Sequence, residues 1–277
     1  MTALSLSGLN IYPIKSAAGV AVQTAKLTSR GLQHDRRWMI VDAQGKFITQ
    51  RQFPRMALMS VALADTLQIS APEMPNLIVP PVSDRKKRVA VEVWGDACQA
   101  ILVGKECDAW LTQFLKTNCR LVYMPDDTKR PAEHGKLGPS TLVSFADAYP
   151  YLLISEASLS GLNQRLQEQG AEPVTMSRFR PNLIVSGARE PHAEDTWQQV
   201  KIGKATFDLP KPCARCSIPN VDTRTGLRGK EPTQTLSTYR FWNKGIWFGQ
   251  NAVQAGDRLD EASILRVGDR IEVLSYQ

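Results

Sequence analysis

The stretch RRWMIVDAQGKFITQR, residues 36–51, decides how the first part of this chain folds. It contains two short β-rich segments, RRWMIVD and KFITQR, which are separated only by the tripeptide AQG. Asp42 and Gly45 lie at the join, and such residues favour turns between strands. The stretch therefore predicts short strands with tight connections.

The same rhythm continues on both sides of this stretch. Further β-rich or alternating segments follow one another closely, and they are LSGLNIYPI (6–14), VQTAKLTS (22–29), MALMSVAL (56–63), TLQISA (66–71), NLIVP (76–80) and VAVEVW (89–94). Gly, Pro, Asn or Asp marks most of the joins. Closely spaced short strands are typical of a barrel or a strongly bent sheet.

A helical segment interrupts the strands at residues 104–117, GKECDAWLTQFLKT. Asp108 is its predicted N-cap, and apolar residues from Trp110 to Leu115 fall on one helical face. A second helix is predicted over 155–170, capped by Ser155 and ended by Gly170, and strands then return. We predict a mainly β chain with a few short helices (α+β), divided into domains 1–120 and 121–277.

Composition is that of an ordinary water-soluble protein. Of the 277 residues, 43% are hydrophobic and 22% are charged, and no apolar run is long enough to span a bilayer. The N-terminal residues MTALSLSGLNIYPIKS lack the features of a secretory signal. Five cysteines form an odd set without a disulfide rhythm, so we expect reduced thiols in a cytoplasmic protein without membrane attachment.

The net charge of +7 raises the question of an anionic partner. The densest basic run, DRKKR at 84–88, is typical of a solvated loop, and no nucleic-acid-binding motif accompanies it. We therefore expect no nucleic-acid binding. The charge suits a small anionic ligand or an acidic electron-transfer partner.

A pair of cysteines, Cys213 and Cys216, lies within KPCARCSIPNVDTRTG at 211–226. Structural zinc needs four ligands, and the chain offers neither a second pair nor two nearby histidines. A thioredoxin-like pair would open a helix, whereas the residues that follow favour a loop or a strand. Two packed thiols without a role remain an alternative. Against it, Arg215 beside Cys216 favours a thiolate, which is a ligand for soft metals.

Cationic and polar residues form a second group of candidates. Lys15 and Ser16 end a predicted strand, Arg36 begins another, and RFRPN supplies Arg180 and Asn182. Charge-assisted hydrogen bonds from such residues suit the oxygens of a phosphate. Their spacing alone does not identify a common ligand.

Several motifs together closely resemble the MOSC-domain molybdenum enzymes, with the nearest match among the bacterial YcbX-like proteins and the mitochondrial amidoxime-reducing component. The motifs follow the same order along almost the whole chain, and they are YPIKS, GLQHDRRWMIVD, TQRQFPRM, SFADAYPYLLISEASL, RFRPNLIVSG, KPCARCSIPNVDTRTG and FGQN. The resemblance implies an N-terminal β-barrel-like domain followed by a MOSC β-barrel domain. It also implies a molybdopterin form of the molybdenum cofactor between them.

Site residues are carried over from this resemblance position by position. Cys216 matches the catalytic cysteine whose thiolate binds molybdenum, which makes Cys213 a neighbour. The positions that match cofactor-binding residues are Lys15, Ser16 and Arg36 at the phosphate and Asp147, Arg180, Asn182 and Arg215 elsewhere along the cofactor. Ala148 and Tyr149 depart from the small hydroxyl residues of the mitochondrial relatives.

The resemblance implies a molybdenum-dependent reductase that converts N-hydroxylated compounds (hydroxylamines, amidoximes and N-hydroxylated bases) to amines. Electrons are expected from an iron–sulfur, ferredoxin-type donor, either a separate protein or a deleted domain, together with a flavin reductase. The alternative is a carrier of molybdenum cofactor or of persulfide sulfur without reductase activity.

Overall fold

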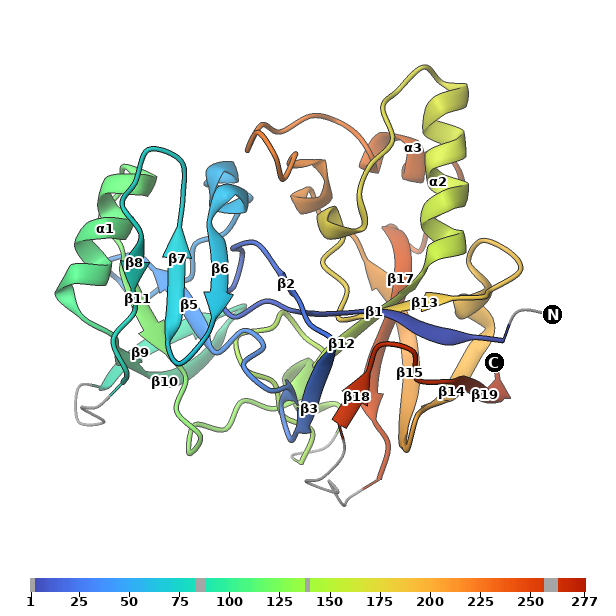
Figure 1. The fold of residues 1–277 in the computed structure, drawn as a ribbon, viewed down its shortest axis with the longest axis horizontal. Helices are drawn as coiled ribbons and strands as arrows, with labels where there is room; N and C mark the ends of the chain where they lie inside the picture. The colour runs from blue at the N-terminus through green and yellow to red at the C-terminus, as the bar shows by residue number, and fades with distance from the viewer. Residues whose placement is uncertain (1–2, 83–87, 138–139, 257–263) are drawn as a thin grey trace.

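The computed structural model describes residues 3–82, 88–137, 140–256 and 264–277, which form two lobes (Figure 1). We call the lobe that contains α1 and β5 to β11 the small lobe, and the remainder the large lobe. Residues 84–87 of the predicted basic loop lie outside the described residues, and Arg88 begins strand β9. In the described part of the chain, no helix is long and apolar enough to cross a membrane.

Two antiparallel sheets build the small lobe. The first has the order β5 (Trp38–Val41), β11 (Arg120–Tyr123), β10 (Asp96–Leu102) and β9 (Arg88–Val93). The second has the order β6 (Ser60–Leu63), β7 (Leu67–Ser70) and β8 (Leu77–Ile78). Helix α1 (Lys105–Leu115) packs against them (Figure 1).

The predicted apolar face of α1 is confirmed, because Trp110, Leu111, Phe114 and Leu115 are all buried in the small-lobe core. Burial of each large side chain contributes about 1.5–3 kcal/mol. The predicted N-cap is wrong. The observed N-cap is Gly104, four residues earlier, and the carboxylate of Asp108 instead accepts a hydrogen bond from the backbone N–H of Leu121 at 2.8 Å.

A long sheet forms the centre of the large lobe. Its order is β19 (Ile271–Tyr276), β14 (Trp197–Ile202), β15 (Ala205–Ala214), β17 (Gly245–Gln254), β12 (Tyr151–Ser155), β13 (Leu183–Ser186), β1 (Ser5–Ile11) and β2 (Val20–Ala21), with β16 (Phe241–Trp242) beside β17. A small sheet adds β18 (Ile264–Arg266), β3 (Thr24–Thr28) and β4 (Gly31–Leu32).

Helices α2 (Glu156–Glu168) and α3 (Thr233–Tyr239) lie on the same side of the large lobe (Figure 1). The predicted cap of α2 is confirmed, since the Ser155 hydroxyl accepts a hydrogen bond from the backbone N–H of Ser158. Short 3₁₀ turns occur at Pro54–Leu58, Ala132–Gly135, Met176–Arg178, Ala193–Thr196 and Ile218–Asn220. The mainly β fold class with few helices is confirmed.

The large-lobe core gathers side chains from both ends of the chain. Leu6 from β1 and Ile271 from β19 belong to the same buried cluster as Tyr151 and Phe207, whose rings meet edge to face at 5.1 Å. Strand β1 therefore belongs to the large lobe, while β11 pairs with β5 and β10 in the small lobe. Strands from before residue 120 therefore pair with strands from after it in both lobes. The predicted division into domains 1–120 and 121–277 stays a prediction.

The predicted strand at 46–51 is wrong for most of its length. Phe47 forms an isolated bridge with Val41, and the chain then turns. The Gln52 side chain accepts hydrogen bonds from both the backbone and the hydroxyl of Thr49. This local turn ends the extended segment and directs Arg51 toward the cleft between the lobes.

Candidate functional site

The cleft between the lobes collects every site residue expected from the sequence. Its lining includes Lys15, Ser16, Arg36, Asp147, Arg180, Asn182, Arg215 and Cys216. They come from the end of β1, the start of β5, the loop before β12, the segment before β13 and the residues after β15. Segments far apart in sequence thus meet in one place, and the individual roles of these residues stay predictions.

Lys15 is held where the chain leaves β1 for the small lobe. Its backbone N–H donates to the carbonyl of Trp38 at 2.8 Å, and its side chain is almost fully buried. Its ammonium donates to the carbonyl of Phe145 at 2.8 Å and to the carboxylate of Asp147. Burial lowers the pKa of Lys15, although the charge of Asp147 opposes that shift.

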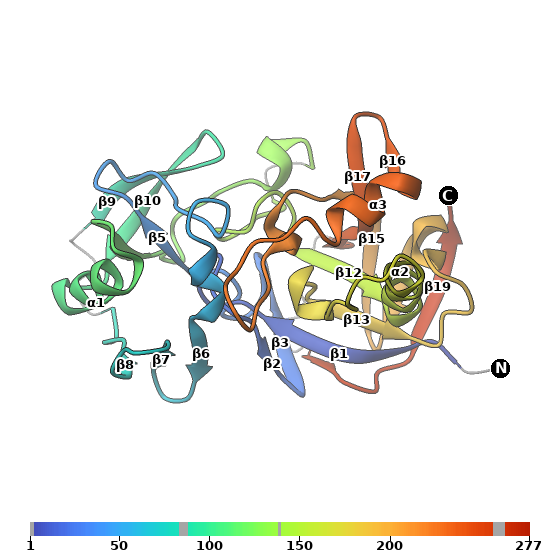
Figure 2. The same cartoon turned by 90° about the horizontal axis from the view of Figure 1, so that it is seen from above.

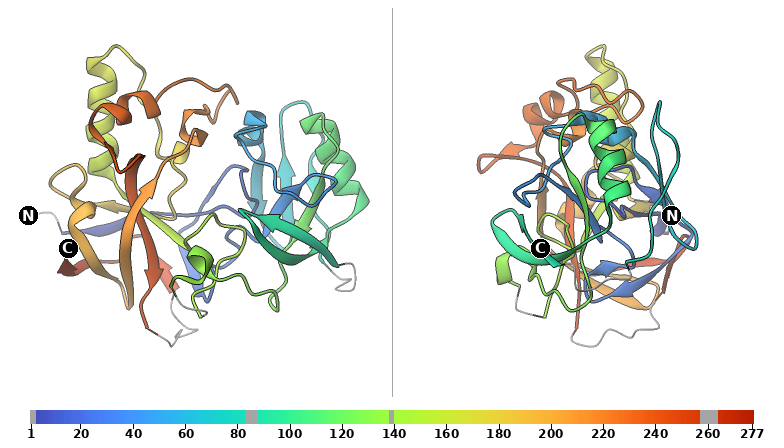
Figure 3. Two further views of the ribbon diagram at one scale, coloured as in Figure 1. Left: turned by 180° about the vertical axis from the view of Figure 1, so that it is seen from behind. Right: turned by 90° about the vertical axis from the view of Figure 1, so that its left-hand side faces the viewer.

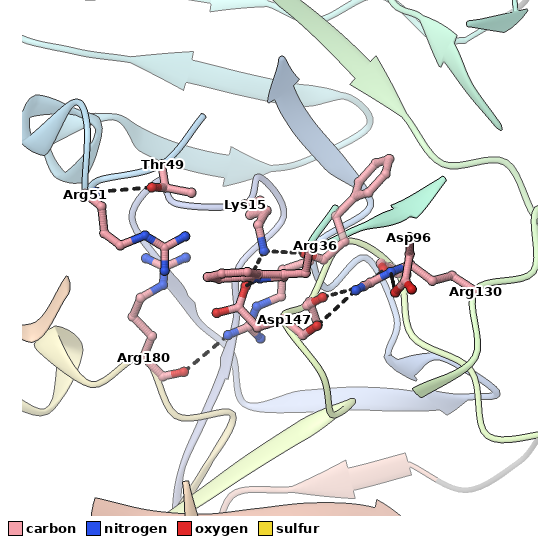
Figure 4. Close-up of polar contacts among 12 residues, drawn as sticks. Lys15, Arg36, Thr49, Arg51, Asp96, Arg130, Asp147 and Arg180 are labelled. Carbon is pink, nitrogen blue, oxygen red and sulfur yellow. Dashed lines mark hydrogen bonds and ion pairs between the residues drawn. The ribbon is translucent and has the colours of Figure 1, made fainter. Parts of the chain in front are cut away.

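Asp147 is fixed from two directions. Besides the Lys15 ammonium, the indole N–H of Trp94 donates to its Oδ1 at 3.0 Å. Desolvation alone would raise the pKa of Asp147, but Lys15 and Trp94 together hold it well below the ordinary value. Asp147 is therefore ionised at neutral pH, and Figure 4 shows it at the centre of the surrounding cations.

Arg36 joins the segment before β5 to the segment before β13. Its guanidinium donates to Asp35 at 2.5 Å and to the amide oxygen of Asn182 at 3.0 Å. Asp35 is itself buried and accepts the backbone N–H of Tyr12 at 2.8 Å. The guanidinium of Arg36 is thus oriented by groups that are themselves fixed.

Arg180 shares an aromatic support with Arg36. The guanidinium groups of Arg180 and Arg36 lie 4.3 and 4.4 Å from the ring centroid of Tyr12. Arg180 also donates to the backbone carbonyl of Ala17. Desolvation and the neighbouring charge of Arg36 lower the pKa of Arg180 to about 10, so the Arg180 guanidinium remains charged at neutral pH.

Three residues of this cleft have left-handed backbone conformations. Ser16, Arg36 and Arg180 have φ values of 68°, 48° and 60°. A non-glycine residue at positive φ costs of order 1 kcal/mol, and such strain concentrates at functional sites. We call Lys15, Arg36 and Arg180 the cationic end of the cleft.

The cysteines lie in the part of the lining that comes from the end of β15 and the residues after it, which we call the thiol end: Cys213, Arg215 and Cys216. Cys213 is near the end of β15 and is partly buried, whereas Cys216 follows the strand and is exposed. The Arg215 guanidinium donates to the sulfur of Cys213 at 3.2 Å and to the carbonyl of Phe179 at 2.8 Å. Arg215 therefore contacts Cys213, although the sequence had suggested support for Cys216.

The other three cysteines have a different environment. Cys98, Cys107 and Cys119 are buried in the cores of the small lobe. Burial raises the pKa of the Cys107 and Cys119 thiols to about 11, which keeps both protonated at neutral pH. Thiolate chemistry is therefore confined to the thiol end.

Metal-ligating side chains do not cluster in the described ranges. No group of three or more His, Cys, Asp or Glu residues there could hold a metal ion. A metal at the thiol end would thus need further ligands from a non-protein group.

Sequence reasoning missed Arg51, which lines the cleft, and Trp94, which contacts two of its lining residues. Arg51 is labelled in Figure 4, and its guanidinium lies 4.4 Å from the ring centroid of Trp94. Trp94 and Gly95 form the two-residue turn between β9 and β10, both at positive φ. The glycine at position 95 could have predicted the turn. No pattern in the sequence predicts that this turn contacts Asp147.

Ala148 and Tyr149 take local structural positions. The Ala148 carbonyl accepts the backbone N–H of Glu133 at 2.9 Å. Tyr149 is largely buried, and the Lys211 ammonium lies 5.2 Å from its ring centroid. These contacts hold the loop beside Asp147 without a small hydroxyl residue.

Comparison with known proteins matches both parts of the chain. Residues 3–118 match the MOSC N-terminal beta barrel domain, and residues 140–272 match the MOSC domain. Mitochondrial amidoxime-reducing component 1 of Homo sapiens is 34% identical over 98% of this chain and 83% of its own length. The Mus musculus protein of that name is 35% identical over 98% and 82%. Molybdenum cofactor sulfurase of Danio rerio is 31% identical over 96% of this chain and 34% of its own length.

Proposed function

The chain belongs to the MOSC family, and from that premise we propose that it is a molybdenum-cofactor-dependent reductase of N-hydroxylated compounds. The observation that carries the proposal is the cleft itself, where an exposed thiol, Cys216, shares a lining with a group of fixed cations. Similarity to the amidoxime-reducing components supports the reaction class.

The residues present fit a phosphorylated, anionic cofactor. Among the described residues, five cationic side chains line the cleft, namely Lys15, Arg36, Arg51, Arg180 and Arg215, against one lining carboxylate, that of Asp147. The buried Nε of Arg215 has no hydrogen-bond partner. Such an excess of oriented donors favours a multiply charged anion.

Each end of the cleft would hold a different part of the cofactor. Lys15, Ser16 and Arg36 would bind the phosphate, with Arg180 and Asn182 beside it. The Cys216 thiolate would bind molybdenum, since thiolate is a soft ligand and the described residues offer no cluster of other metal ligands. When bound, the cofactor supplies two-electron transfer to the N–O bond of the substrate.

The overall reaction is R–NHOH + 2 e⁻ + 2 H⁺ → R–NH₂ + H₂O, in which the N–O bond breaks and nitrogen is reduced. The chain's own part is to bind, orient and stabilise. The cationic end fixes the anionic group through preorganised donors, and Cys216 tunes the metal through its sulfur. Because Cys216 is exposed, water can reach this end of the cleft and supply the two protons.

The test uses protein purified from a molybdenum-replete host. We expect about one molybdenum and one pterin per chain, and turnover of an aromatic amidoxime such as benzamidoxime with reduced methyl viologen as electron donor. A protein loaded with molybdenum and pterin that reduces neither an amidoxime nor a hydroxylamine would contradict the proposal.

A second candidate is a carrier of cofactor or persulfide sulfur. It is favoured by the similarity to molybdenum cofactor sulfurase together with the exposure of Cys216. A persulfide assay on the same sample separates the two functions. Labile sulfur on Cys216 without reductase turnover supports the carrier, whereas turnover by the loaded protein supports the reductase.

A further inference from the structure

A hairpin of the large lobe exposes aromatic side chains to solvent. Strands β16 and β17 pair with Phe241 opposite Ile246 and Trp242 opposite Gly245, which leaves a two-residue turn at positive φ. Phe241 is 59% exposed and Trp242 is 37% exposed. Figures 2 and 3 show the hairpin projecting from the body of the lobe.

The hairpin is a rigid platform. The Trp242 and Trp247 rings stack at 5.9 Å with an interplanar angle of 24°, and the Trp247 indole N–H donates to the carbonyl of Trp242 at 2.8 Å. The Arg240 guanidinium lies 4.7 Å from the Trp242 ring centroid. Exposed tryptophans with little conformational entropy to lose are typical anchors of protein–protein interfaces.

The hairpin is continuous with the thiol end of the cleft. Trp247 lies opposite Ala214 in the β15–β17 ladder, and the Arg215 N–H donates to the Ile246 carbonyl at 2.7 Å. Cys216 follows Ala214 by two residues, so its Cα lies within about 13 Å of the Trp247 Cα by backbone dimensions. The redox centre of a protein bound to the hairpin would therefore lie close to Cys216, the proposed metal ligand.

The surrounding chain is strongly basic. Residues 211–251 contain seven basic side chains, Lys211, Arg215, Arg224, Arg228, Lys230, Arg240 and Lys244, and two acidic ones, Asp222 and Glu231. This segment therefore carries a net charge of +5 within a chain of net charge +7. Arg240 and Lys211 are paired with Asp195 and Glu133 from outside the segment, whereas Arg224, Arg228, Lys230 and Lys244 are exposed. These exposed cations favour a partner with complementary negative charge.

Docking at the hairpin leaves the cleft accessible. Phe241, Trp242 and Trp247 are not among the described residues that line it. The hairpin aromatic side chains and the cleft lining are therefore separate sets of residues. This arrangement suits a reaction that needs two electrons from a carrier that supplies one at a time.

We propose that the β16–β17 hairpin is the docking site of an acidic one-electron carrier protein of the reduced iron–sulfur type. This inference rests on the proposed reductase function. Two carriers each lose one electron in successive dockings, and the two electrons with two protons cleave one N–O bond. Trp242 is the apolar anchor, and Lys244 at the exposed turn provides electrostatic attraction.

The experiment compares two electron sources with the same holoenzyme. One is an acidic plant-type [2Fe–2S] ferredoxin kept reduced by NADPH and a flavin reductase, and the other is reduced methyl viologen, which needs no docking site. We expect Trp242→Ala to raise the KM for ferredoxin about tenfold or more. Lys244→Glu should raise it several-fold at low salt and weaken its salt dependence. Turnover driven by viologen should stay within about twofold of wild type.

Matched controls lie on another face of the large lobe. Tyr276→Ala removes an aromatic ring that is 64% exposed, and Lys201→Glu reverses an exposed charge on β14. Neither should change the KM for ferredoxin. The proposal is overturned if both hairpin variants keep the wild-type KM, if the controls match them, or if viologen-driven turnover falls in parallel.

Direct binding separates this inference from the proposed function. Calorimetric titration with ferredoxin at low salt should show binding that Trp242→Ala abolishes, whether or not the protein turns over an amidoxime with viologen. Absence of ferredoxin binding to wild type overturns the docking site alone. Displacement of ferredoxin by a single-stranded oligonucleotide at equal or lower concentration also overturns it, because the hairpin would then recognise nucleic acid.

Discussion

The two ends of the cleft are built in different ways. At the cationic end, Lys15, Arg36 and Arg180 each donate to backbone carbonyls or to fixed side chains, and Tyr12 supports both guanidinium groups. At the thiol end, Cys216 lies beyond the end of a strand and is exposed. One end is rigid and largely withdrawn from water, and the other is open.

This difference matches two separate tasks. Donors that are already oriented bind an anion without reorganisation, which suits anchoring. An exposed sulfur can bind a metal and still leave that metal accessible to a substrate. We therefore expect substitution of Cys216 to lower turnover far more than cofactor content, and substitutions at the cationic end to lower cofactor content far more than turnover per bound cofactor.

The largest effect is expected from Cys216→Ala. Removing the thiolate should lower viologen-driven amidoxime turnover by about a thousandfold or more, because the metal loses its protein ligand. Pterin content should fall much less, since the cationic end is unchanged. Turnover and bound pterin are measured on the same preparation.

Cys213→Ala is the matched control, because it removes a thiol three residues away and leaves Cys216 in place. It should keep most of the turnover. Equal loss in both variants, or full activity in Cys216→Ala, would refute the division between metal ligand and neighbour.

A smaller effect is expected from Lys15→Met. Loss of a charge-assisted hydrogen bond should weaken retention of the phosphorylated cofactor about tenfold or more. Turnover per bound molybdenum should change little, because the thiol end is intact. Metal and pterin analysis after dialysis measures retention.

The double variant Lys15→Met/Asp147→Asn controls for the carboxylate that the single variant leaves without its ammonium partner. It should retain the cofactor as poorly as Lys15→Met if the ammonium binds phosphate. Recovery of wild-type retention in the double variant would show that the effect came from the unpaired carboxylate.

The smallest effect concerns the stability contributed by Asp147. Its pKa is lowered in the folded state, so its ionic stabilisation is present above about pH 4 and is lost as pH falls through the folded pKa. Because its side chain is 58% exposed, we expect Asp147→Asn to lower the unfolding free energy by about 1 kcal/mol or less near pH 7. Denaturant titrations should show this difference shrinking below about pH 4. A difference that grows on acidification would contradict the assigned ion pair.

Much of the fold followed from local sequence pattern. Alternating and β-rich segments predicted most strands, and the apolar face of α1 and the Ser155 cap of α2 were predicted correctly. One error arose because the Gln52 side chain bonds Thr49 and forms a turn where a strand was predicted. Another arose because the Asp108 carboxylate, the predicted N-cap, accepts a tertiary hydrogen bond from Leu121 instead. Helix α3 and the β16–β17 hairpin carried no pattern strong enough to predict.

The candidate site residues were named from motifs and resemblance, and the structure brings all of them to one cleft. Arg51 and Trp94 were missed because each acts through a partner that is distant in sequence. The contact of Arg215 with Cys213 was also missed, since a neighbour in sequence need not be the nearest side chain in space.

The amino-acid sequence alone determined the strand-rich character of the protein and its family motifs, because these depend on residue type and short spacing, and the family resemblance of those motifs implied Cys216 as the candidate thiol. Only the tertiary structure decided which cations share a cleft, which thiols are buried and which aromatic hairpin stands beside Cys216. Those properties arise from strand pairing across long sequence separations, as in the pairing of β1 with β13 and of β15 with β17. Burial and neighbouring charges then set the pKa values and accessibility of the residues that this pairing brings together.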